Sequence, residues 1–147
     1  MRSSNQTFYV GPKTTVVGCR AEIEGEGRSV VIGDDCMFSD EINIRNYDMH
    51  TVFDVESGAI LNRPPKDLVI DKHVWIGYRA LILAPERIGR GSIVGASSLA
   101  NKPIEPFSLA VGAPAKIAKR GVSWSRPVNH VEPRDLQFAR EESARLS

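Results

Sequence analysis

Apolar residues recur at every sixth position over the second half of the chain. Counting in steps of six from Ile70 gives an apolar residue each time as far as Ala100, and most of these residues are β-branched. The residue that follows is often small, as at Gly77, Gly89 and Gly95. A period of six fits neither the repeat of an α-helix nor the alternation of a flat strand. It predicts short strands joined by tight turns, in which Gly or Asp adopts unusual backbone angles.

The same spacing is present earlier in the chain, at Ile32, Phe38 and Ile44. Three such hexads make one triangular coil, and stacked coils bury a continuous apolar column because a single coil cannot cover its own face. The alternative is a series of evenly spaced β-hairpins, which the consecutive matches disfavour. The general rule for crossovers between parallel strands favours a right-handed turn, and nothing in the period overrides it.

The repeat is interrupted once and is followed by segments of different composition. Residues 46–66 contain Asp, Gly, Asn and a Pro-Pro pair, which predict a loop that projects from the coils. We expect residues 1–131 to form one β-helix domain with this insertion, closed at its C-terminal end by a Pro-containing cap. Residues 132–147 are expected to form a helical tail, because Pro133 suits a first helical turn. Its apolar stripe is thin, so we expect light packing, for which a neighbouring subunit is a candidate.

Composition and charge narrow the class of protein. The length of 147 residues suits one domain, and 41% hydrophobic and 25% charged residues are ordinary values for a globular protein. A net charge of +1 argues against bulk nucleic-acid binding. No apolar run approaches the ~18 residues that a membrane span needs, and no signal-peptide core follows Met1. We therefore expect a cytoplasmic protein without membrane insertion, in which Cys19 and Cys36 are free thiols.

Residues 68–120 resemble the C-terminal half of the hexapeptide-repeat acyltransferases, which include galactoside, maltose, serine and capsular-polysaccharide acetyltransferases. The most specific matches are VWIG at 74–77, IVGASS at 93–98 and VGAPAK at 111–116. The resemblance implies an all-β solenoid, a left-handed parallel β-helix of about five coils, and assembly as a homotrimer. The left hand comes from the resemblance and opposes the general rule. The segment FSDEINIRNYDMH at 38–50 is most similar to the branch that acetylates sugars and polysaccharides.

The interrupting loop contains the candidate catalytic base. Members of this superfamily carry an essential histidine on such a loop, often in an Asp-x-His setting, and Asp48-Met49-His50 matches it. His50 also precedes Trp75 by 25 residues, about the separation shown by the family. A neutral imidazole can remove the proton of an acceptor hydroxyl as that oxygen attacks an acetyl thioester. Asp48 would orient the ring or stabilise the imidazolium, and a backbone carbonyl is the alternative for that role.

The resemblance also implies how coenzyme A is bound. Trp75 is expected to line the thioester, its indole N–H being a possible donor, and the backbone N–H of Tyr78 is expected to stabilise the oxyanion. Tyr78 and Met49 replace residues that are usually small in relatives. Small residues at Gly77 and Ala96 would let the pantetheine arm lie close, and lysines toward the cap would contact the phosphates. The expected cofactor-binding residues are Trp75, Gly77, Tyr78, Ala96, Asn101, Lys102, Lys116 and Lys119.

The leading hypothesis is therefore an acetyl-CoA-dependent O-acetyltransferase that acts on a carbohydrate acceptor without a metal. An N-acetyltransferase acting on an amino sugar, a xenobiotic acetyltransferase and a non-catalytic trimeric scaffold are the alternatives. The scaffold predicts neither a base nor a cofactor cluster. A carbonic anhydrase on the same helix needs zinc-binding histidines, two of them close in sequence, and His50, His73 and His130 offer no such pair. His73 falls in a turn and is expected to face solvent. The sequence does not specify the acceptor.

Overall fold

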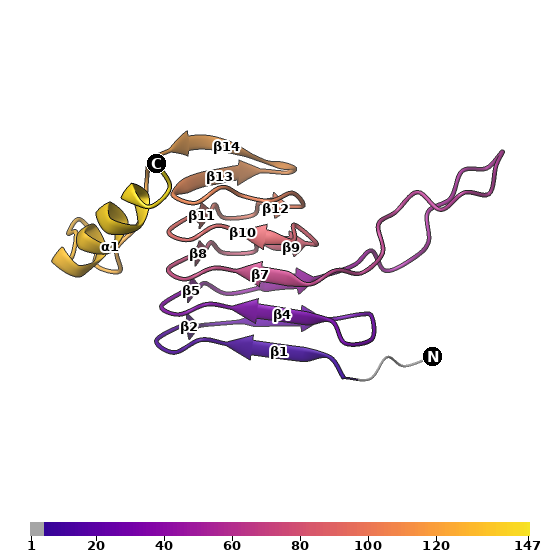
Figure 1. Ribbon diagram of the computed structural model, residues 1–147, viewed down its shortest axis with the longest axis horizontal. Coiled ribbons are helices and arrows are strands. Elements are labelled where there is room, and N and C mark those ends of the chain that lie inside the picture. The colour runs from indigo at the N-terminus through magenta and orange to yellow at the C-terminus, as the bar shows by residue number, and fades with distance from the viewer. Residues whose placement is uncertain (1–4) are drawn as a thin grey trace.

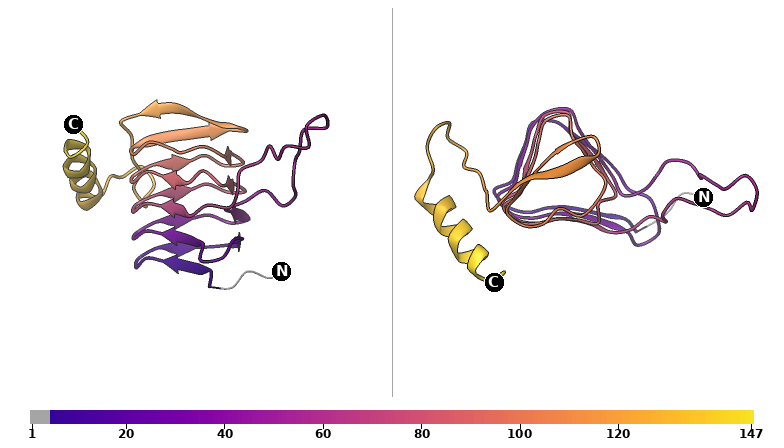
Figure 2. Two further views of the ribbon diagram at one scale, coloured as in Figure 1. Left: turned by 45° about the vertical axis from the view of Figure 1, so that its right-hand side comes forward. Right: turned by 90° about the horizontal axis from the view of Figure 1, so that it is seen from above.

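Successive hexads form successive strands of a parallel β-helix in the computed structural model, which describes residues 5–147 (Figure 1). Three strands make one turn of the chain, and equivalent strands of successive turns stack into three sheets. Seen from above, these sheets enclose a triangle, as the sixfold spacing of apolar residues predicts (Figure 2). Strands within a sheet are parallel except for β13 and β14, which form an antiparallel hairpin.

The three sheets are named A, B and C here, in the order in which the chain enters them. Sheet A contains β1 (Thr7–Val10), β4 (Ser29–Ile32), β7 (Leu68–Ile70) and β10 (Arg87–Ile88). Sheet B contains β2 (Thr15–Val16), β5 (Met37–Phe38), β8 (Trp75–Ile76), β11 (Ile93–Val94), β13 (Ser108–Gly112) and β14 (Ala115–Arg120). Sheet C contains β3 (Cys19–Glu22), β6 (Ile42–Arg45), β9 (Leu81–Leu83) and β12 (Leu99–Ala100).

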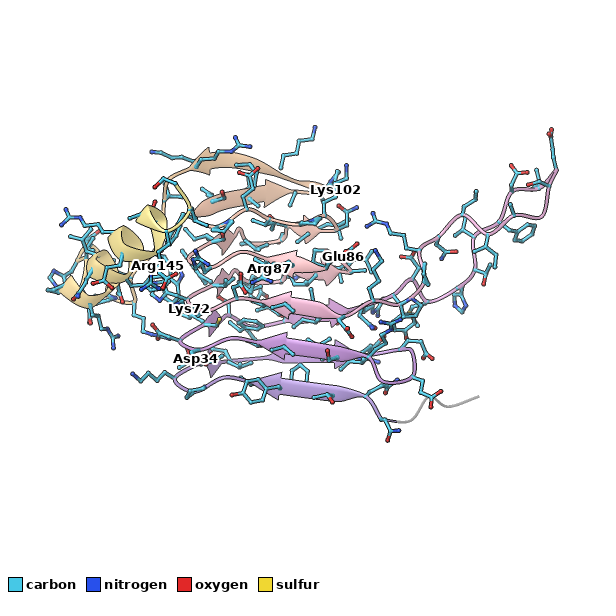
Figure 3. The ribbon with its side chains drawn as sticks, viewed as in Figure 1. Asp34, Lys72, Glu86, Arg87, Lys102 and Arg145 are labelled. Atoms are coloured by element: carbon cyan, nitrogen blue, oxygen red, sulfur yellow. The ribbon has the colours of Figure 1, made fainter. Side chains whose placement is uncertain are left out.

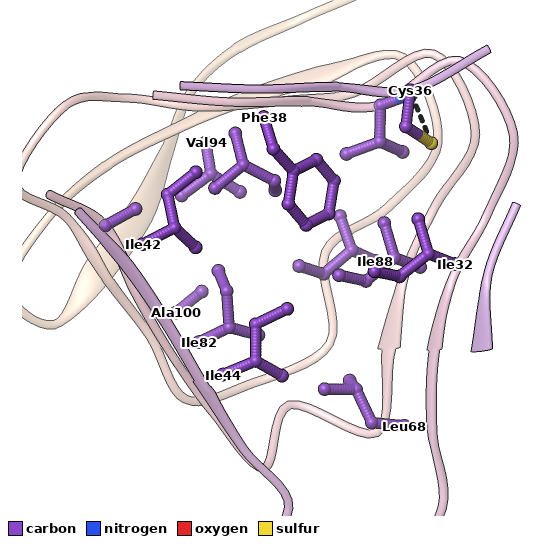
Figure 4. Close-up of a cluster of buried hydrophobic side chains, with 14 of the residues drawn as sticks. Ile32, Cys36, Phe38, Ile42, Ile44, Leu68, Ile82, Ile88, Val94 and Ala100 are labelled. Carbon is purple, nitrogen blue, oxygen red and sulfur yellow. Dashed lines mark hydrogen bonds between the residues drawn. The ribbon is translucent and has the colours of Figure 1, made fainter. Parts of the chain in front are cut away.

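The hexad residues point inward and form one column between the sheets. Ile32 and Ile70 are neighbours on adjacent strands of sheet A, and Ile44 and Ile82 are neighbours on sheet C. All four side chains are buried, and side chains from the three sheets meet inside the triangle (Figure 4). Burying an aliphatic side chain of this size contributes about 1.5–3 kcal/mol, so this column is the main source of stability.

The small residues that follow the hexad positions allow close stacking of the turns, and the unusual backbone angles expected of Gly or Asp occur two residues later, at Asp35 and Gly91 among others. Gly77 has no positive φ, and a Cβ atom there would lie 2.6 Å from the backbone N of Ala96 on the next turn. The left-handed conformation occurs two residues later, with φ of 58° at Arg79. The equivalent residues of other turns also have positive φ: Asp35, His73, Gly91 and Ser97.

The C-terminal end of the column is covered by the β13–β14 hairpin, as the sequence predicts. Its last strand leaves one edge without a partner strand among the described residues. Lys116 and Lys119 are exposed on this strand, and lysines on an edge strand oppose pairing with another chain. Cys19 and Cys36 are free thiols, and burial raises the pKa of each to about 11.

The chain leaves the β-helix at two places, which lie on opposite sides of it (Figures 1 and 2). The loop between β6 and β7 projects from the corner between sheets C and A, where the sequence predicts it. Helix α1 (Pro133–Ala144) lies beside the corner between sheets A and B. Of the described residues, no helix has the length and apolar character needed to cross a membrane.

Helix α1 packs on its own chain through few residues, because most of its side chains are exposed and its buried residues are Asp135 and Glu142. Glu142 is 7% exposed, and its carboxylate lies 2.7 Å from Lys72 Nζ and 2.9 Å from Arg90 Nε. Phe138 packs on Phe107, with ring centroids 5.9 Å apart. Figure 3 shows Lys72 on the side of the β-helix that faces the helix, and Arg145 beside the helix whose end it follows.

Candidate active site

The root of the loop is held by the buried side chain of Asn46. Its Nδ2 donates to the carbonyl oxygens of Glu24 and Lys66, both at 2.9 Å, and its Oδ1 accepts from the Glu24 N–H at 2.9 Å. One amide thereby joins the two arms of the loop to the turn beneath them. The loop must leave the β-helix at this point, and a buried asparagine satisfies the backbone groups that lose their strand partners there.

A hollow of about 670 Å³ opens between the two arms of the loop. One arm contributes Tyr47, Asp48, Met49, His50 and Thr51. The other arm contributes Ile60 and the run Asn62 to Pro65, and Glu24 lies at the base. The lining combines apolar surface with a base, carboxylates and a guanidinium, which suits a ligand that carries many hydroxyl groups.

His50 is exposed at this hollow, and its ring nitrogens are available to a bound molecule. Within residues 5–147, neither the His50 ring nor the exposed Asp48 carboxylate makes a hydrogen bond. An imidazole with two free nitrogens can accept a proton from a bound molecule. The structure thus brings the predicted base and Asp48 to one hollow but does not pair them, and the supporting role of Asp48 stays a prediction.

A second hollow, of about 260 Å³, adjoins the first and shares Tyr47, Asp48, Asn62 and Arg63 with it. Asn101 lines this hollow, and its Oδ1 atom is buried without a hydrogen bond among the described residues. Lys102 follows it and is exposed on the side of the β-helix from which the loop leaves (Figure 3). These two predicted cofactor-binding residues therefore lie at the same corner as the candidate base.

Tyr78 and Ala96 lie at a different corner, between sheets B and C. The backbone N–H of Tyr78, the predicted oxyanion donor, makes no hydrogen bond in the described part of the chain. Its phenol O–H donates to Glu41 at 2.9 Å, and this hydrogen bond raises the pKa of Tyr78. Gly77 beside it is buried, and stacking on Ala96 alone accounts for the glycine. The donor is thus free, but it is on another corner from His50.

Trp75 is on the outer face of sheet B, and its indole packs on Trp124, with ring centroids 6.3 Å apart. Its Nε1 atom is buried without a partner among residues 5–147. Lys116 and Lys119 lie on the capping hairpin. One chain therefore places the predicted site residues on several separate surfaces, and the loop corner holds His50, Asp48, Asn101 and Lys102.

The other central histidine is buried, which corrects the expectation that it faces solvent. His73 is 4% exposed, and its ring stacks on Trp124 with centroids 4.3 Å apart. Its Nδ1 lies 2.9 Å from Asp35 Oδ2 and its Nε2 lies 3.1 Å from Trp124 O. Trp124 Nε1 donates in return to His73 O at 2.9 Å. Both ring nitrogens face acceptors, so this ring has a structural role.

The same corner contains a group with the composition of a metal site. One ligand atom each from Asp35, His73 and Asp135 lies within 4.8 Å of the others. The carboxylates are already engaged, because Arg126 Nη2 lies 2.9 Å from Asp35 Oδ1 and Arg134 Nε lies 3.6 Å from Asp135 Oδ1. Two guanidinium groups at this distance oppose the binding of a cation. The group is an ion-pair network that attaches the C-terminal segment.

Comparison with known proteins places the chain among acetyltransferases. No family model matches it. It is 35% identical over 117 residues to the polysialic acid O-acetyltransferase of Escherichia coli O1:K1 / APEC, which covers 80% of this chain and 38% of the relative. It is 34% identical over 128 residues to the polysialic acid O-acetyltransferase of Neisseria meningitidis, with 86% and 59% covered. The chain thus spans less than two thirds of the length of these curated relatives.

Solved structures of acetyltransferases are also similar to this chain. The crystal structure of the polySia specific acetyltransferase NeuO superposes with a TM-score of 0.80 and 31% identity, covering 97% of this chain and 65% of that one. This chain belongs to the hexapeptide-repeat acetyltransferase superfamily. Its β-helix is left-handed, like those of its structural neighbours, so the hand and superfamily implied by the resemblance are confirmed.

One further structural neighbour contains acetyl coenzyme A. The hexapeptide-repeat acetyltransferase VCA0836 of Vibrio cholerae, in complex with acetyl coenzyme A, superposes with a TM-score of 0.53 and 23% identity, covering 76% of this chain and 70% of that one. This likeness shows the fold alone.

Several residues of the loop corner were missed by sequence reasoning. Asn62 and Arg63 line both hollows, and Tyr47 does so from the other arm. Residues 62–65 were predicted only as part of the loop 46–66, because Asn and Pro are common in loops. A signal was nevertheless present, since the predicted loop has two arms and a hollow between them is lined by both.

Proposed function

We propose that this chain transfers an acetyl group from acetyl-CoA to a hydroxyl group of a sugar or polysaccharide. The observation that carries the proposal is the exposed His50, with both ring nitrogens free, at a hollow large enough for a sugar unit. The similarity to two polysialic acid O-acetyltransferases supports an acidic polysaccharide as the first acceptor to test.

The chemistry follows from a free base beside a bound hydroxyl. Neutral His50 takes the proton of the acceptor hydroxyl while that oxygen forms a bond to the acetyl carbonyl carbon. The carbonyl oxygen becomes an oxyanion, and the backbone N–H of Tyr78 donates to it. When the carbon–sulfur bond breaks, the imidazolium of His50 returns the proton to the leaving thiolate. The step is balanced without a metal or a covalent enzyme intermediate.

The donor is expected to lie along the outside of the β-helix. Tyr78 offers a free N–H and Ala96 a small exposed side chain, so a pantetheine arm can approach the backbone there. Trp75 would line the thioester, and Lys102, Lys116 and Lys119 would contact the phosphates. One structure of the same fold is a complex with acetyl-CoA, so this thioester is the first donor to test.

We propose further that the active unit is a homotrimer. The base at one corner and the oxyanion donor at another cannot serve one reaction within a single chain, so a neighbouring copy must supply one of them. Large apolar side chains exposed on the loop would be covered by that neighbour. They are Met49, Val52, Phe53, Val55, Ile60 and Leu61, which are between 51% and 88% exposed.

The test is an acetyl-transfer assay with a panel of acceptors. The purified chain is incubated with acetyl-CoA and neutral sugars, amino sugars, polysialic acid or chloramphenicol, and release of free thiol is followed. Turnover with a hydroxyl acceptor of the carbohydrate class, with the product's ester located by mass spectrometry, supports the proposal. Turnover only with amines, or with chloramphenicol alone, would overturn the assignment of acceptor.

A further inference from the structure

The segment that carries His50 is held by very few contacts. In the described part of the chain, residues 47–51 make one hydrogen bond, in which Asn62 Nδ2 donates to the His50 carbonyl oxygen at 2.8 Å. The preceding residue, Asn46, is fixed at the root of the loop. The position of residues 47–51, and with it the position of the His50 ring, therefore depends on the side chain of Asn62.

Asn62 binds this segment at two points. Its Oδ1 accepts from the Val52 N–H at 2.8 Å while its Nδ2 donates to His50 O. The amide therefore binds the His50 carbonyl oxygen and the Val52 N–H, which lie on either side of Thr51. A primary amide can do both at once, and no carboxylate or hydroxyl of the same size offers an acceptor and a fixed donor in one plane.

The reason for a side chain here lies in the shape of the loop. Farther out, the two arms pair through their backbones: Leu61 N–H donates to Val52 O at 2.8 Å and Asp54 N–H donates to Ala59 O at 2.8 Å. Nearer the β-helix the arms separate to form the hollow of about 670 Å³. Asn62 stands where the pairing ends, so its side chain spans a gap that the backbone no longer closes.

We propose that Asn62 is a positioning residue, which sets the place of His50 in the hollow through the His50 carbonyl. The proposal rests on the proposed function, because it assumes that His50 is the base. Asn62 is not needed for the existence of the loop. Asn46 closes its root, and Asp54 Oδ1 caps its tip by accepting from the Ser57 N–H at 2.7 Å.

The informative variant is Asn62→Asp, which keeps the shape and the acceptor for Val52 N–H. It removes the donor and places a carboxylate oxygen against the carbonyl oxygen of His50. A displacement of about 1 Å can lower turnover by about 10²-fold, and we expect a fall of this order in kcat. The KM for acetyl-CoA should not change. Ser57→Ala is the matched control, since Ser57 is in the same loop and binds only its tip.

A double-mutant cycle separates positioning from a general effect on structure. If Asn62 acts through His50, Asn62→Asp should cause no further loss in a His50→Ala background. Independent losses that multiply would overturn the proposal, as would full kcat in both Asn62→Asp and Asn62→Ala. Circular dichroism and light scattering must show that the variants are folded and assembled as the parent. A normal rate for His50→Ala itself would instead overturn the base assigned under the proposed function, so the two failures are distinguishable.

Discussion

Two corners of the β-helix each present a histidine, and the two side chains are in opposite states. His50, on the loop corner, is exposed and its ring makes no hydrogen bond within residues 5–147. His73, on the helix corner, is buried with Asp35 at one nitrogen and Trp124 at the other. The comparison shows why only one of them can serve as a base. A ring that transfers protons needs a free nitrogen, whereas a ring bonded at both ends holds parts of the fold together.

The surroundings of the two histidines differ in the same way. At the loop corner, residues 47–51 make one hydrogen bond in the described part of the chain, and the loop exposes six large apolar side chains. The helix corner joins the turns at Asp35 and His73 to the C-terminal segment by ion pairs and stacked rings. Segments with few buried contacts open more easily, so the loop corner can adjust to an acceptor while the helix corner stays fixed.

The largest expected effect is on catalysis at the loop corner. His50→Ala should lower turnover by about 10²- to 10⁴-fold, the usual contribution of a positioned base. Thermal stability and acetyl-CoA affinity should change little, because the ring is exposed and acts on the acceptor. The rate is measured with the acceptor found in the panel. Near-full turnover by a folded His50→Ala protein would contradict the assignment.

At the helix corner we expect a loss of stability instead. His73→Ala removes the stacked ring and the hydrogen-bond partner of the Trp124 carbonyl and of Asp35 Oδ2, while Arg126 still binds Asp35 Oδ1. The free energy of unfolding should fall by about 2–4 kcal/mol, as for other buried polar residues. Denaturant unfolding measures it, with His130→Ala as the exposed control. Turnover of the folded fraction should change far less than in His50→Ala. A large loss of turnover in His73→Ala with little loss in His50→Ala would instead make His73 the base.

The helix corner should also weaken in acid. Burial alone would raise the pKa of Asp35, but hydrogen bonds from Arg126 and His73 outweigh it and hold that pKa below its usual range. The hydrogen bond from Lys72 likewise lowers the pKa of Glu142. A carboxylate with a lowered pKa stabilises the fold above its unfolded-state pKa, and this contribution is lost as the pH falls through the folded-state value.

Unfolding midpoints measured from about pH 7 to about pH 2 test this. The Asp35→Asn variant should be less stable at neutral pH and should lose less stability on acidification than the parent. Asparagine also tolerates the positive φ of 53° at this position. An unchanged slope of stability against pH would show that Asp35 does not hold the helix corner.

The smallest expected effect is that of Asp48→Asn. The Asp48 carboxylate lines the hollow, but it makes no hydrogen bond to His50 in the described structure. We expect turnover to fall by less than about tenfold, or 1.4 kcal/mol. Parallel rate measurements on Asp48→Asn and His50→Ala decide the point, and equal losses would make Asp48 indispensable for catalysis.

The sequence predicted the β-helix and its loop correctly because both depend on local pattern. An apolar residue at every sixth position is sufficient to place Ile70, Ile76 and Ile82 on three walls of one coil. The loss of that spacing after Arg45 is sufficient to place the loop. The handedness does not follow from the period, and it was obtained from resemblance to known acetyltransferases.

The sequence by itself thus determined the coils, the position of the loop and the identity of the candidate base. Only the tertiary structure decided which histidine is free. His73 meets Asp35 across 38 residues and Trp124 across 51, and no local pattern encodes contacts between turns that stack far apart in the chain. Asn62 meets His50 across 12 residues, because the arms of the loop separate at that point. The physical reason is the same in both cases. The partners of a side chain depend on which residues the stacked turns, or the two arms of the loop, bring next to it. The repeat specifies that the turns stack but not which polar side chains meet.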